Sequence, residues 1–203
     1  IEPGGELVGL PKGIMGNSEV GHMNLGAGRP VRQDLVIINE AIEKDQFKDQ
    51  EKFQQLINYA KVGTKRIHLL GLLSDGGVHS HIDHLIYVHQ QLQTHPELEV
   101  YFHAFSDGRD TSNKMGIKYL KTIDELGIKV ASIQGRSIGM DRDRRWEKIE
   151  HAYKTFIGEG DKTKSTAIQY IQKKYDEDIY DEFITPTLLL EEGKIQENDS
   201  VFF

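Results

Sequence analysis

Arginines, aspartates and histidines gather in three glycine-containing segments of the chain. The segments are "SDGGVHSH" (residues 74–81), "SDGRD" (106–110) and "GRSIGMDRDRRW" (135–146). The planar guanidinium group of arginine suits two-point contact with a phosphate or a carboxylate, which a flexible lysine binds less specifically. We therefore expect a site for an anionic ligand, with five candidate residues: His79, Arg109, Asp110, Arg136 and Arg142.

A serine lies in a fourth glycine-rich segment, "GNSEVGHMNLGAGR" (16–29). A serine hydroxyl is a poor nucleophile at neutral pH unless a base, a metal ion or a helix N-terminus stabilises its alkoxide. The segment lacks the order G-x-S-x-G that is typical of acyl-transfer enzymes. Ser18 is therefore a candidate nucleophile whose activating groups lie elsewhere, and the alternative is that it caps the N-terminus of a helix.

Each of these features also has a purely structural interpretation. The sequences "DGG" and "DGR" are common in turns. The arginines of segment 141–145 alternate with aspartates and could form local ion pairs at a solvated helix start. His81 and His84 are better explained as a helix cap or as solvent-facing residues than as metal ligands, and His68 and His103 lie within strand patterns, which favours a place in the core.

The polar segments follow apolar runs of strand length at residues 66–73, 99–105 and 128–134. Helical patterns separate these runs, which predicts βαβ units and a parallel sheet. We expect a three-layer α/β/α fold with a mostly parallel sheet. Ligands bind beyond the carboxyl ends of the strands in such sheets, which is where the three polar segments lie. One predicted helix presents a single apolar face formed by Trp146, Ile149, Tyr153 and Phe156.

The last twenty residues and the first thirty have a different character. Residues 183–203 contain Pro186 within an apolar run and an "EEGK" turn, so we expect a C-terminal edge hairpin or an extension of the sheet. The opening "IEPGGELVGLPKG" is rich in glycine and proline and has no element before it. We expect the chain to be a domain from a longer protein.

Composition limits the possible functions. The chain has 203 residues, a formal net charge of -7 and no cysteine. The absence of cysteine excludes disulfides, thiolate metal sites and cysteine nucleophiles. The acidic balance argues against binding to nucleic acid or to an anionic membrane surface. No apolar run approaches the roughly 20 residues that span a bilayer, and we expect a cytoplasmic protein.

Four longer motifs occur in order: "MGNSEVGHMNLGAGR", "GLLSDGGVHSH", "HAFSDGRD" and "GRSIGMDRDRRWEK". In these motifs, and along its whole length, the chain resembles the cofactor-independent phosphoglycerate mutases. That family resembles the alkaline phosphatase superfamily in its metal-bearing domain, into which a transferase domain is inserted. The resemblance implies that residues 1–29 are a glycine-rich loop of the phosphatase-like domain, which carries the nucleophilic serine. Residues 30–203 would then be the transferase, or substrate-binding, domain.

The resemblance also implies an activity and a role for each candidate residue. The enzyme would be a glycolytic isomerase that interconverts 3-phosphoglycerate and 2-phosphoglycerate through a phosphoserine, without 2,3-bisphosphoglycerate. Ser18 would carry the phosphoryl group and ligate one of two Mn²⁺ ions, and the other metal ligands would lie outside this chain. The isolated chain would then be inactive, and the full-length enzyme a monomer. The substrate would be bound by five residues: His79, Arg109, Asp110, Arg136 and Arg142.

The chain departs from the family pattern at one place, and two alternative functions remain open. The family usually has an aromatic pair where this chain has Ser137 and Ile138, next to Arg136. A different class of function is a non-catalytic module that binds a sugar phosphate or a nucleotide, although no G-x-G-x-x-G follows a predicted strand, which weakens the nucleotide version. Hydrolysis, in which water takes the phosphoryl group, is a third possibility.

Overall fold

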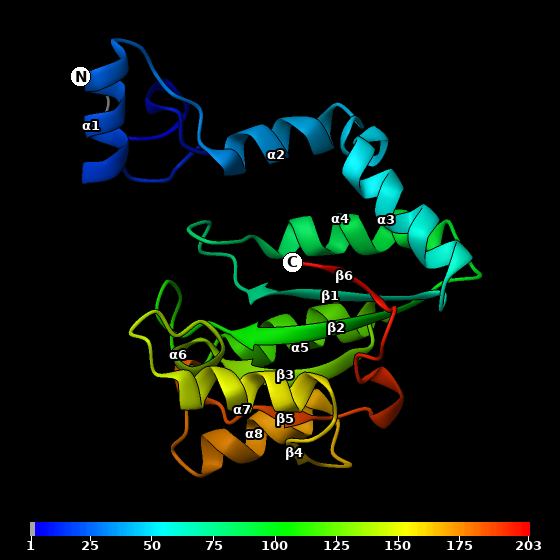
Figure 1. Ribbon diagram of the computed structural model, residues 1–203. Helices are drawn as coiled ribbons and strands as arrows, with labels where there is room; N and C mark the ends of the chain where they lie inside the picture. The colour runs from blue at the N-terminus through cyan, green and yellow to red at the C-terminus, as the bar shows by residue number, and fades with distance from the viewer. Residues whose placement is uncertain (1–2) are drawn as a thin grey trace. The chain divides into compact units, whose positions relative to one another are not determined.

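The computed structural model describes residues 3–203 and divides the chain into two compact units. The N-terminal unit ends at Phe53, and the C-terminal unit runs from Gln54 to Phe203. Figure 1 shows the course of the chain. Helix α3 (Glu51–Val62) contains the junction between the units. Each unit is described separately.

The N-terminal unit is built from short helices joined by glycine-containing turns. Its elements are the 3₁₀ turn η1 (Glu6–Val8), helix α1 (Ser18–Ala27), helix α2 (Asp34–Glu43) and the 3₁₀ turn η2 (Phe47–Asp49). The side chain of Asn24 in α1 donates to the carbonyl of Val8 and accepts from the N–H of Val31. This amide therefore ties α1 to the segments before and after it. We expected residues 1–29 to be a loop, but ten of them form α1, and residues 1 and 2 lie outside the described part of the chain.

The C-terminal unit contains a six-stranded sheet in the order β4-β5-β3-β2-β1-β6. Strands β1, β2 and β3 form its centre and are parallel to one another. Strand β6 is parallel to β1 at one edge, and within the described residues 3–203 the only antiparallel strand pair of this sheet joins β3 to β5. The strand bounds are β1 Arg66–Leu73, β2 Glu99–Ser106, β3 Val130–Gly135, β4 Asp161–Lys162, β5 Thr187–Leu188 and β6 Ser200–Phe202.

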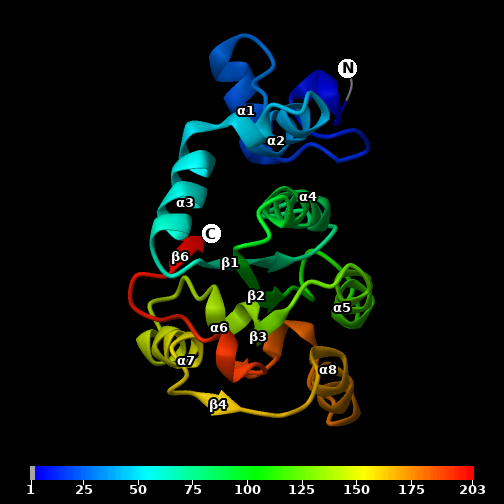
Figure 2. The same cartoon turned by 90° about the vertical axis from the view of Figure 1, so that its right-hand side faces the viewer.

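Helices cover both faces of this sheet. Figure 2 shows α4, α5 and α8 on one face and α7 on the other, which confirms the three-layer arrangement. The short helix α6 follows β3 directly, so that its first residue, Arg136, lies at the strand end. The helix bounds are α4 Ile82–Gln93, α5 Gly116–Glu125, α6 Arg136–Gly139, α7 Trp146–Phe156 and α8 Ala167–Asp176.

The C-terminal tail extends the sheet and does not form a hairpin. Its two strands, β5 and β6, lie on opposite sides of the central strands, and β5 pairs with β3 while β6 pairs with β1. The 3₁₀ turns η3 (Asp181–Phe183) and η4 (Glu191–Gly193) flank β5. The predicted sheet extension is thus confirmed, and the predicted hairpin alternative is wrong because the tail crosses the sheet between its two strands.

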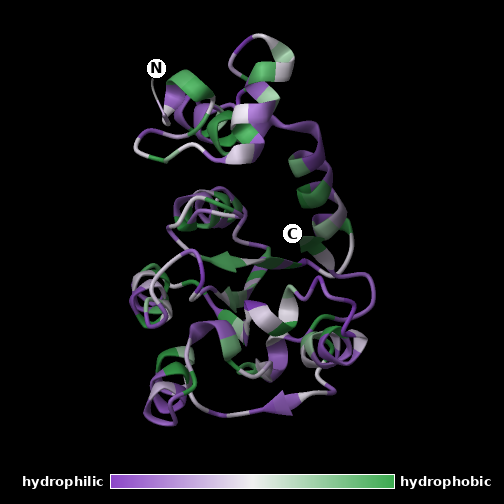
Figure 3. Cartoon of the chain, turned by 90° about the vertical axis from the view of Figure 1, so that its left-hand side faces the viewer, coloured by the Kyte–Doolittle hydropathy of each residue, from purple (hydrophilic) through white to green (hydrophobic). Residues whose placement is uncertain are grey.

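The core of the C-terminal unit consists of the central strands and the inner faces of the helices. Figure 3 shows hydrophobic residues along the central strands and hydrophilic ones on β4. The predicted apolar face of α7 is wrong for two of its four residues: Trp146 is 71% exposed and Tyr153 60% exposed, whereas Ile149 is half-buried and Phe156 packs against His103 and Phe105. The fully buried residues of this helix are the small Ala152 and Thr155. No helix within residues 3–203 is both long and apolar enough to cross a membrane.

Candidate functional site

The three central strands end level with one another, which brings the residues after them together. In the sheet register, Leu73 of β1 pairs with Ser106 of β2, and Ser106 pairs with Gly135 of β3. The next residue along each strand is Ser74, Asp107 and Arg136, and all three side chains are buried. The carboxyl ends of parallel strands are the common place for ligand sites in α/β sheets.

Asp107 connects these three strand ends. Its Oδ2 accepts a 2.6 Å hydrogen bond from the hydroxyl of Ser74, and its Oδ1 accepts one of 2.6 Å from Nη1 of Arg136. The same Oδ1 also accepts from the backbone N–H groups of Arg109 and Asp110, each at 3.1 Å. Burial alone would raise the pKa of Asp107, but these hydrogen bonds outweigh it and lower the pKa. The carboxylate is therefore ionised and fixed in position.

Arg136 is held between two carboxylates. Its Nη1 donates to Asp107 and also to Oδ2 of Asp110, at 2.6 Å in each case. The side chain is 7% exposed, and although burial opposes the charge, Asp110 and Asp107 raise the pKa of Arg136. Both recorded bonds use Nη1, so within the described part of the chain the Nε and Nη2 donors have no recorded acceptor. They are the donors with which this residue can bind an anion in two-point contact.

Arg109 contacts a residue that lies far along the sequence. Its Nη2 donates to Oε1 of Glu182 at 2.5 Å, and Glu182 belongs to η3. The backbone of η3 packs directly on two glycines of the strand ends. A Cβ atom on Gly108, whose φ is +72°, would lie 2.8 Å from the backbone nitrogen of Glu182, and one on Gly135 would lie 2.3 Å from its carbonyl oxygen. Glycine is thus required at both positions.

The structure brings three of the five predicted binding residues together. Asp110 and Arg136 are in direct contact, and Arg109 is linked to them because Asp107 binds both its backbone and Arg136. His79 and Arg142 are exposed on the loops that follow β1 and β3. No recorded side-chain contact joins either of these two to the other three within residues 3–203, so their part in the site stays a prediction.

Sequence reasoning missed three residues of this cluster: Ser74, Asp107 and Glu182. A signal existed for Asp107, because an aspartate that precedes "GRD" can accept hydrogen bonds from the backbone two and three residues later. Ser74 follows its strand in the same way. Glu182 gave no signal, since it lies 73 residues from Arg109 in the sequence and only the tertiary fold brings it close.

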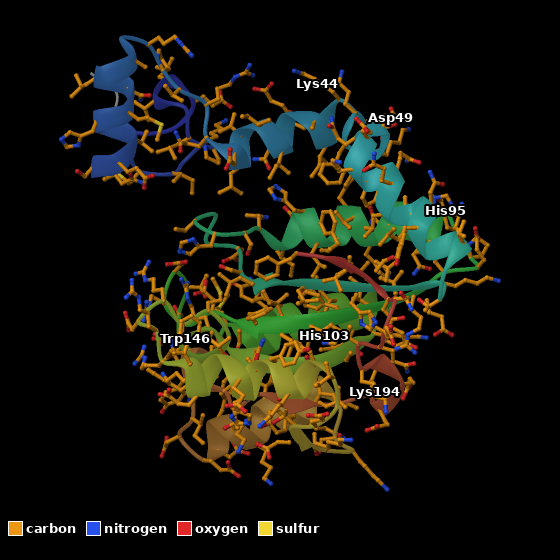
Figure 4. All side chains as sticks on the ribbon, in the orientation of Figure 1. Lys44, Asp49, His95, His103, Trp146 and Lys194 are labelled. Carbon is orange, nitrogen blue, oxygen red and sulfur yellow. The ribbon has the colours of Figure 1, made fainter. Side chains whose placement is uncertain are left out.

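The turn-like segments around the cluster behave as their structural interpretations predicted. Arg145 pairs with Asp141 and Asp143, so part of segment 141–145 is a local ion-pair network. His81 caps helix α4, because its side chain accepts from the N–H of Asp83. His68 and His103 are fully buried in the sheet. Figure 4 shows His103 among the strands.

Ser18 is the first residue of helix α1 but is not its cap. The cap is Asn17, whose side chain accepts from the N–H of Val20 at 3.0 Å. Ser18 is exposed, and its hydroxyl lies 3.2 Å from Nδ1 of His22. The same Nδ1 lies 2.6 Å from the carbonyl oxygen of Ser18, which can only accept. Nδ1 therefore carries a proton, and His22 cannot act as a base toward the hydroxyl in this geometry.

The residues around Ser18 do not form a metal site by themselves. Across residues 3–203, no group of three or more histidine, aspartate or glutamate side chains is arranged to hold a metal ion. Stable divalent sites usually need three or more protein ligands. The metal-ligand role that the sequence resemblance implies for Ser18 thus finds no supporting ligand set in this part of the chain.

Comparison with known proteins places the chain in a family. A family profile described as "BPG-independent PGAM N-terminus" matches residues 38–203, which is most of the chain. The chain belongs to this family. Among curated BPG-independent PGAM relatives, the chain is 43% identical over 212 residues to a 2,3-bisphosphoglycerate-independent phosphoglycerate mutase of Caenorhabditis elegans. It is 42% identical over 205 residues to the protein of the same name from the Aster yellows witches'-broom phytoplasma.

A solved structure shares the fold of this BPG-independent PGAM chain. It is the phosphoglycerate mutase of Leishmania mexicana, determined at low cobalt concentration, with a TM-score of 0.85 and 29% sequence identity. The match covers 99% of this chain and 40% of that structure. The two curated relatives are covered to 39% and 40% of their length, against 100% of this chain. The chain thus spans about two fifths of the relatives that it matches.

Proposed function

We propose that the cluster at the ends of β1, β2 and β3 binds phosphoglycerate in an isomerase that interconverts 3-phosphoglycerate and 2-phosphoglycerate. The observation that supports this most strongly is the Asp107–Arg136–Asp110 arrangement, which sits at the strand ends and leaves donors of a buried guanidinium for an anion. Relatives of about 42% identity that carry the name phosphoglycerate mutase support the substrate class.

Two kinds of group on the substrate match two kinds of group in the cluster. The carboxylate and phosphate of phosphoglycerate need guanidinium donors, which Arg109 and Arg136 supply. The glycerate hydroxyl needs an acceptor, which the carboxylate of Asp110 supplies. Asp110 is itself held by Arg136 at 2.6 Å, so acceptor and donors are set relative to one another before the substrate arrives. His79 and Arg142, on the adjoining loops, complete the proposed set.

The proposed chemistry uses Ser18 as a temporary phosphoryl acceptor. The serine oxygen forms a bond to phosphorus, the bond from phosphorus to the 3-oxygen breaks, and the 3-oxygen takes up the proton that the serine gives up. The oxygen of the 2-hydroxyl of the retained glycerate then forms a bond to phosphorus, the bond from phosphorus to the serine oxygen breaks, and the proton of the 2-hydroxyl goes to the serine. The position of Ser18 at the start of α1 supports this role, because a helix N-terminus favours a developing negative charge.

The other predicted properties of the enzyme accompany this proposal without being needed for it. They are manganese dependence, a monomeric state, a cytoplasmic location and the assignment of residues 1–29 to a phosphatase-like domain. The described residues contain no group of three or more metal-ligating side chains, so the other ligands of a metal ion at Ser18 would lie outside this chain. One feature of the fold supports separate roles for the serine-bearing segment and the substrate-binding domain: Ser18 and Arg136 belong to different compact units.

A coupled assay for 2-phosphoglycerate, on the protein that carries this chain, tests the proposal. We expect turnover of 3-phosphoglycerate that Ser18→Ala abolishes, while Ser165→Ala, a control change in the C-terminal unit, leaves it intact. Release of inorganic phosphate in place of 2-phosphoglycerate would show a hydrolase. Binding of 3-phosphoglycerate without either product would show a non-catalytic module, and unchanged turnover in Ser18→Ala would exclude the phosphoserine.

A further inference from the structure

Glu182 binds the guanidinium group of Arg109, which is proposed to bind the substrate. Its Oε1 accepts a 2.5 Å hydrogen bond from Nη2 of Arg109. The two side chains differ in their surroundings: that of Glu182 is 17% exposed, and that of Arg109 is 52% exposed. The carboxylate is thus largely enclosed by protein, whereas the arginine reaches it from the solvent side.

The backbone beneath Glu182 is fixed on both sides. The carbonyl of Asp181 accepts from the buried hydroxyl of Ser106 at 2.7 Å, and the carbonyl of Ile184 accepts from the N–H of Gly135 at 2.7 Å. The side chain of Asp181 also accepts from the N–H of Gly116 at 2.8 Å, which anchors η3 to the start of α5. Because η3 is held at three points, Glu182 stays in place when its partner moves.

Arg109 is the partner that can move. Its side chain is 52% exposed, and its recorded side-chain contact within the described residues is the single bond to Glu182. The cluster as a whole carries three carboxylates, on Asp107, Asp110 and Glu182, against two guanidinium groups, on Arg109 and Arg136. These five side chains together carry a net negative charge. Among the three carboxylates, that of Glu182 is the one paired with the guanidinium group of Arg109.

We propose that Glu182 is an internal competitor for the substrate: it holds Arg109 until an anionic group of the ligand takes its place, and it thereby limits the affinity of the site. This inference rests on the proposed function, since phosphoglycerate is the ligand. Weak binding is useful in an isomerase, because both the substrate and the product must be able to leave the site. Tight binding of the ground state does not raise the turnover number.

Removing the charge of Glu182 should therefore tighten binding. In Glu182→Gln the amide keeps the shape and can still accept one hydrogen bond, but the ligand no longer displaces an ion pair. Partly exposed pairs of this kind contribute up to about 1 kcal/mol, which corresponds to a gain of about fivefold in affinity for 3-phosphoglycerate. A merely structural role for Glu182 would produce the opposite change, because loss of a positioning contact weakens binding.

Calorimetric or NMR titration of 3-phosphoglycerate into the wild-type chain, Glu182→Gln, Arg109→Ala and the double variant tests the inference. The gain from Glu182→Gln should disappear when Arg109 is absent, because the competitor acts only through that residue. Glu191→Gln is the matched control: it makes the same charge change at a glutamate paired with Lys162 and Lys194, and it should leave affinity unchanged.

The outcomes separate the two proposals. Tighter binding in Glu182→Gln that depends on Arg109 supports the inference. Equal or weaker binding, or a gain that persists without Arg109, overturns the inference and leaves the phosphoglycerate site standing. No binding of 3-phosphoglycerate by either the wild-type chain or Glu182→Gln overturns both.

Discussion

Lowering the pH from 7 to 5 should destabilise the C-terminal unit by about 2 kcal/mol through one buried histidine, His103. His103 lies in a chain of hydrogen bonds that crosses the sheet. Its Nδ1 is 2.8 Å from the hydroxyl of Ser132, its Nε2 is 2.9 Å from Nδ1 of His68, and Nε2 of His68 is 3.0 Å from Oδ2 of Asp199. The carboxylate can only accept, and with both imidazoles neutral each proton in the chain points toward Asp199.

A further proton on His103 would sit on Nδ1, where it would displace the bond donated by the hydroxyl of Ser132 and place a charge inside the buried sheet. Burial, followed by the charge on His68, lowers the pKa of His103 from 6.5 to about 3. Burial also lowers the pKa of His68, although Asp199 opposes this. The unfolded chain therefore binds more protons than the folded one below pH 6.5. Stability is fully present above that pH and falls by about 1.4 kcal/mol for each pH unit below it.

Urea unfolding followed by far-UV circular dichroism at pH 7, 6 and 5 measures this loss. His103→Gln keeps a hydrogen-bonding side chain but cannot titrate, so its free energy of unfolding should be lower at pH 7 and should change less with pH. His79→Gln removes an exposed imidazole from the same unit and serves as the control. The reasoning is refuted if the wild type loses no stability between pH 7 and 5, or if His103→Gln loses as much as the wild type.

Four further substitutions test the local structure by urea unfolding or hydrogen exchange. Asp107→Ala should cost about 3 kcal/mol, because it leaves Arg136 with one carboxylate and several buried donors unpaired; a loss below 1 kcal/mol contradicts this. Gly135→Ala should lower the free energy of unfolding by about 2 kcal/mol, since its Cβ would lie 2.3 Å from the carbonyl oxygen of Glu182. An unchanged free energy of unfolding would show that η3 shifts to make room for the methyl group. Asn17→Ala should destabilise α1 by about 1 kcal/mol while Ser18→Ala has little effect, and the reverse order would make Ser18 the cap.

The central part of the fold could be predicted from the sequence because its signals are local. Apolar runs of strand length gave β1, β2 and β3 nearly to the residue. The tail could not be placed, because strands of two and three residues carry no periodicity, and their partners are chosen by the tertiary fold. Trp146 and Tyr153 were assigned to the core because helical periodicity marks large apolar residues, whereas packing close to the sheet favoured Ala152 and Thr155.

The site was predictable in part for the same reason. Strand ends and glycines pointed to Asp110 and Arg136, which the structure places in contact. Asp107 could not be predicted in this way, because it holds other residues in position and does not itself have the side chain of an anion-binding residue, which is typically arginine. Glu182 belongs to a 3₁₀ turn between α8 and β5, which meets the strand ends only in the tertiary fold. Such contacts depend on the topology, which short motifs do not contain.

Titration of 3-phosphoglycerate into the chain, followed by backbone amide shifts in NMR spectra, tests the central claim most directly. The account predicts saturable shifts confined to the loops at 74–81, 106–110 and 135–142, with a dissociation constant on the order of millimolar, about -4 kcal/mol. Arg136→Lys, which keeps the charge but loses the planar fork, should weaken binding several-fold. Shifts centred elsewhere, or affinity unchanged in Arg136→Lys, would contradict the assignment of the strand-end cluster as the phosphoglycerate site.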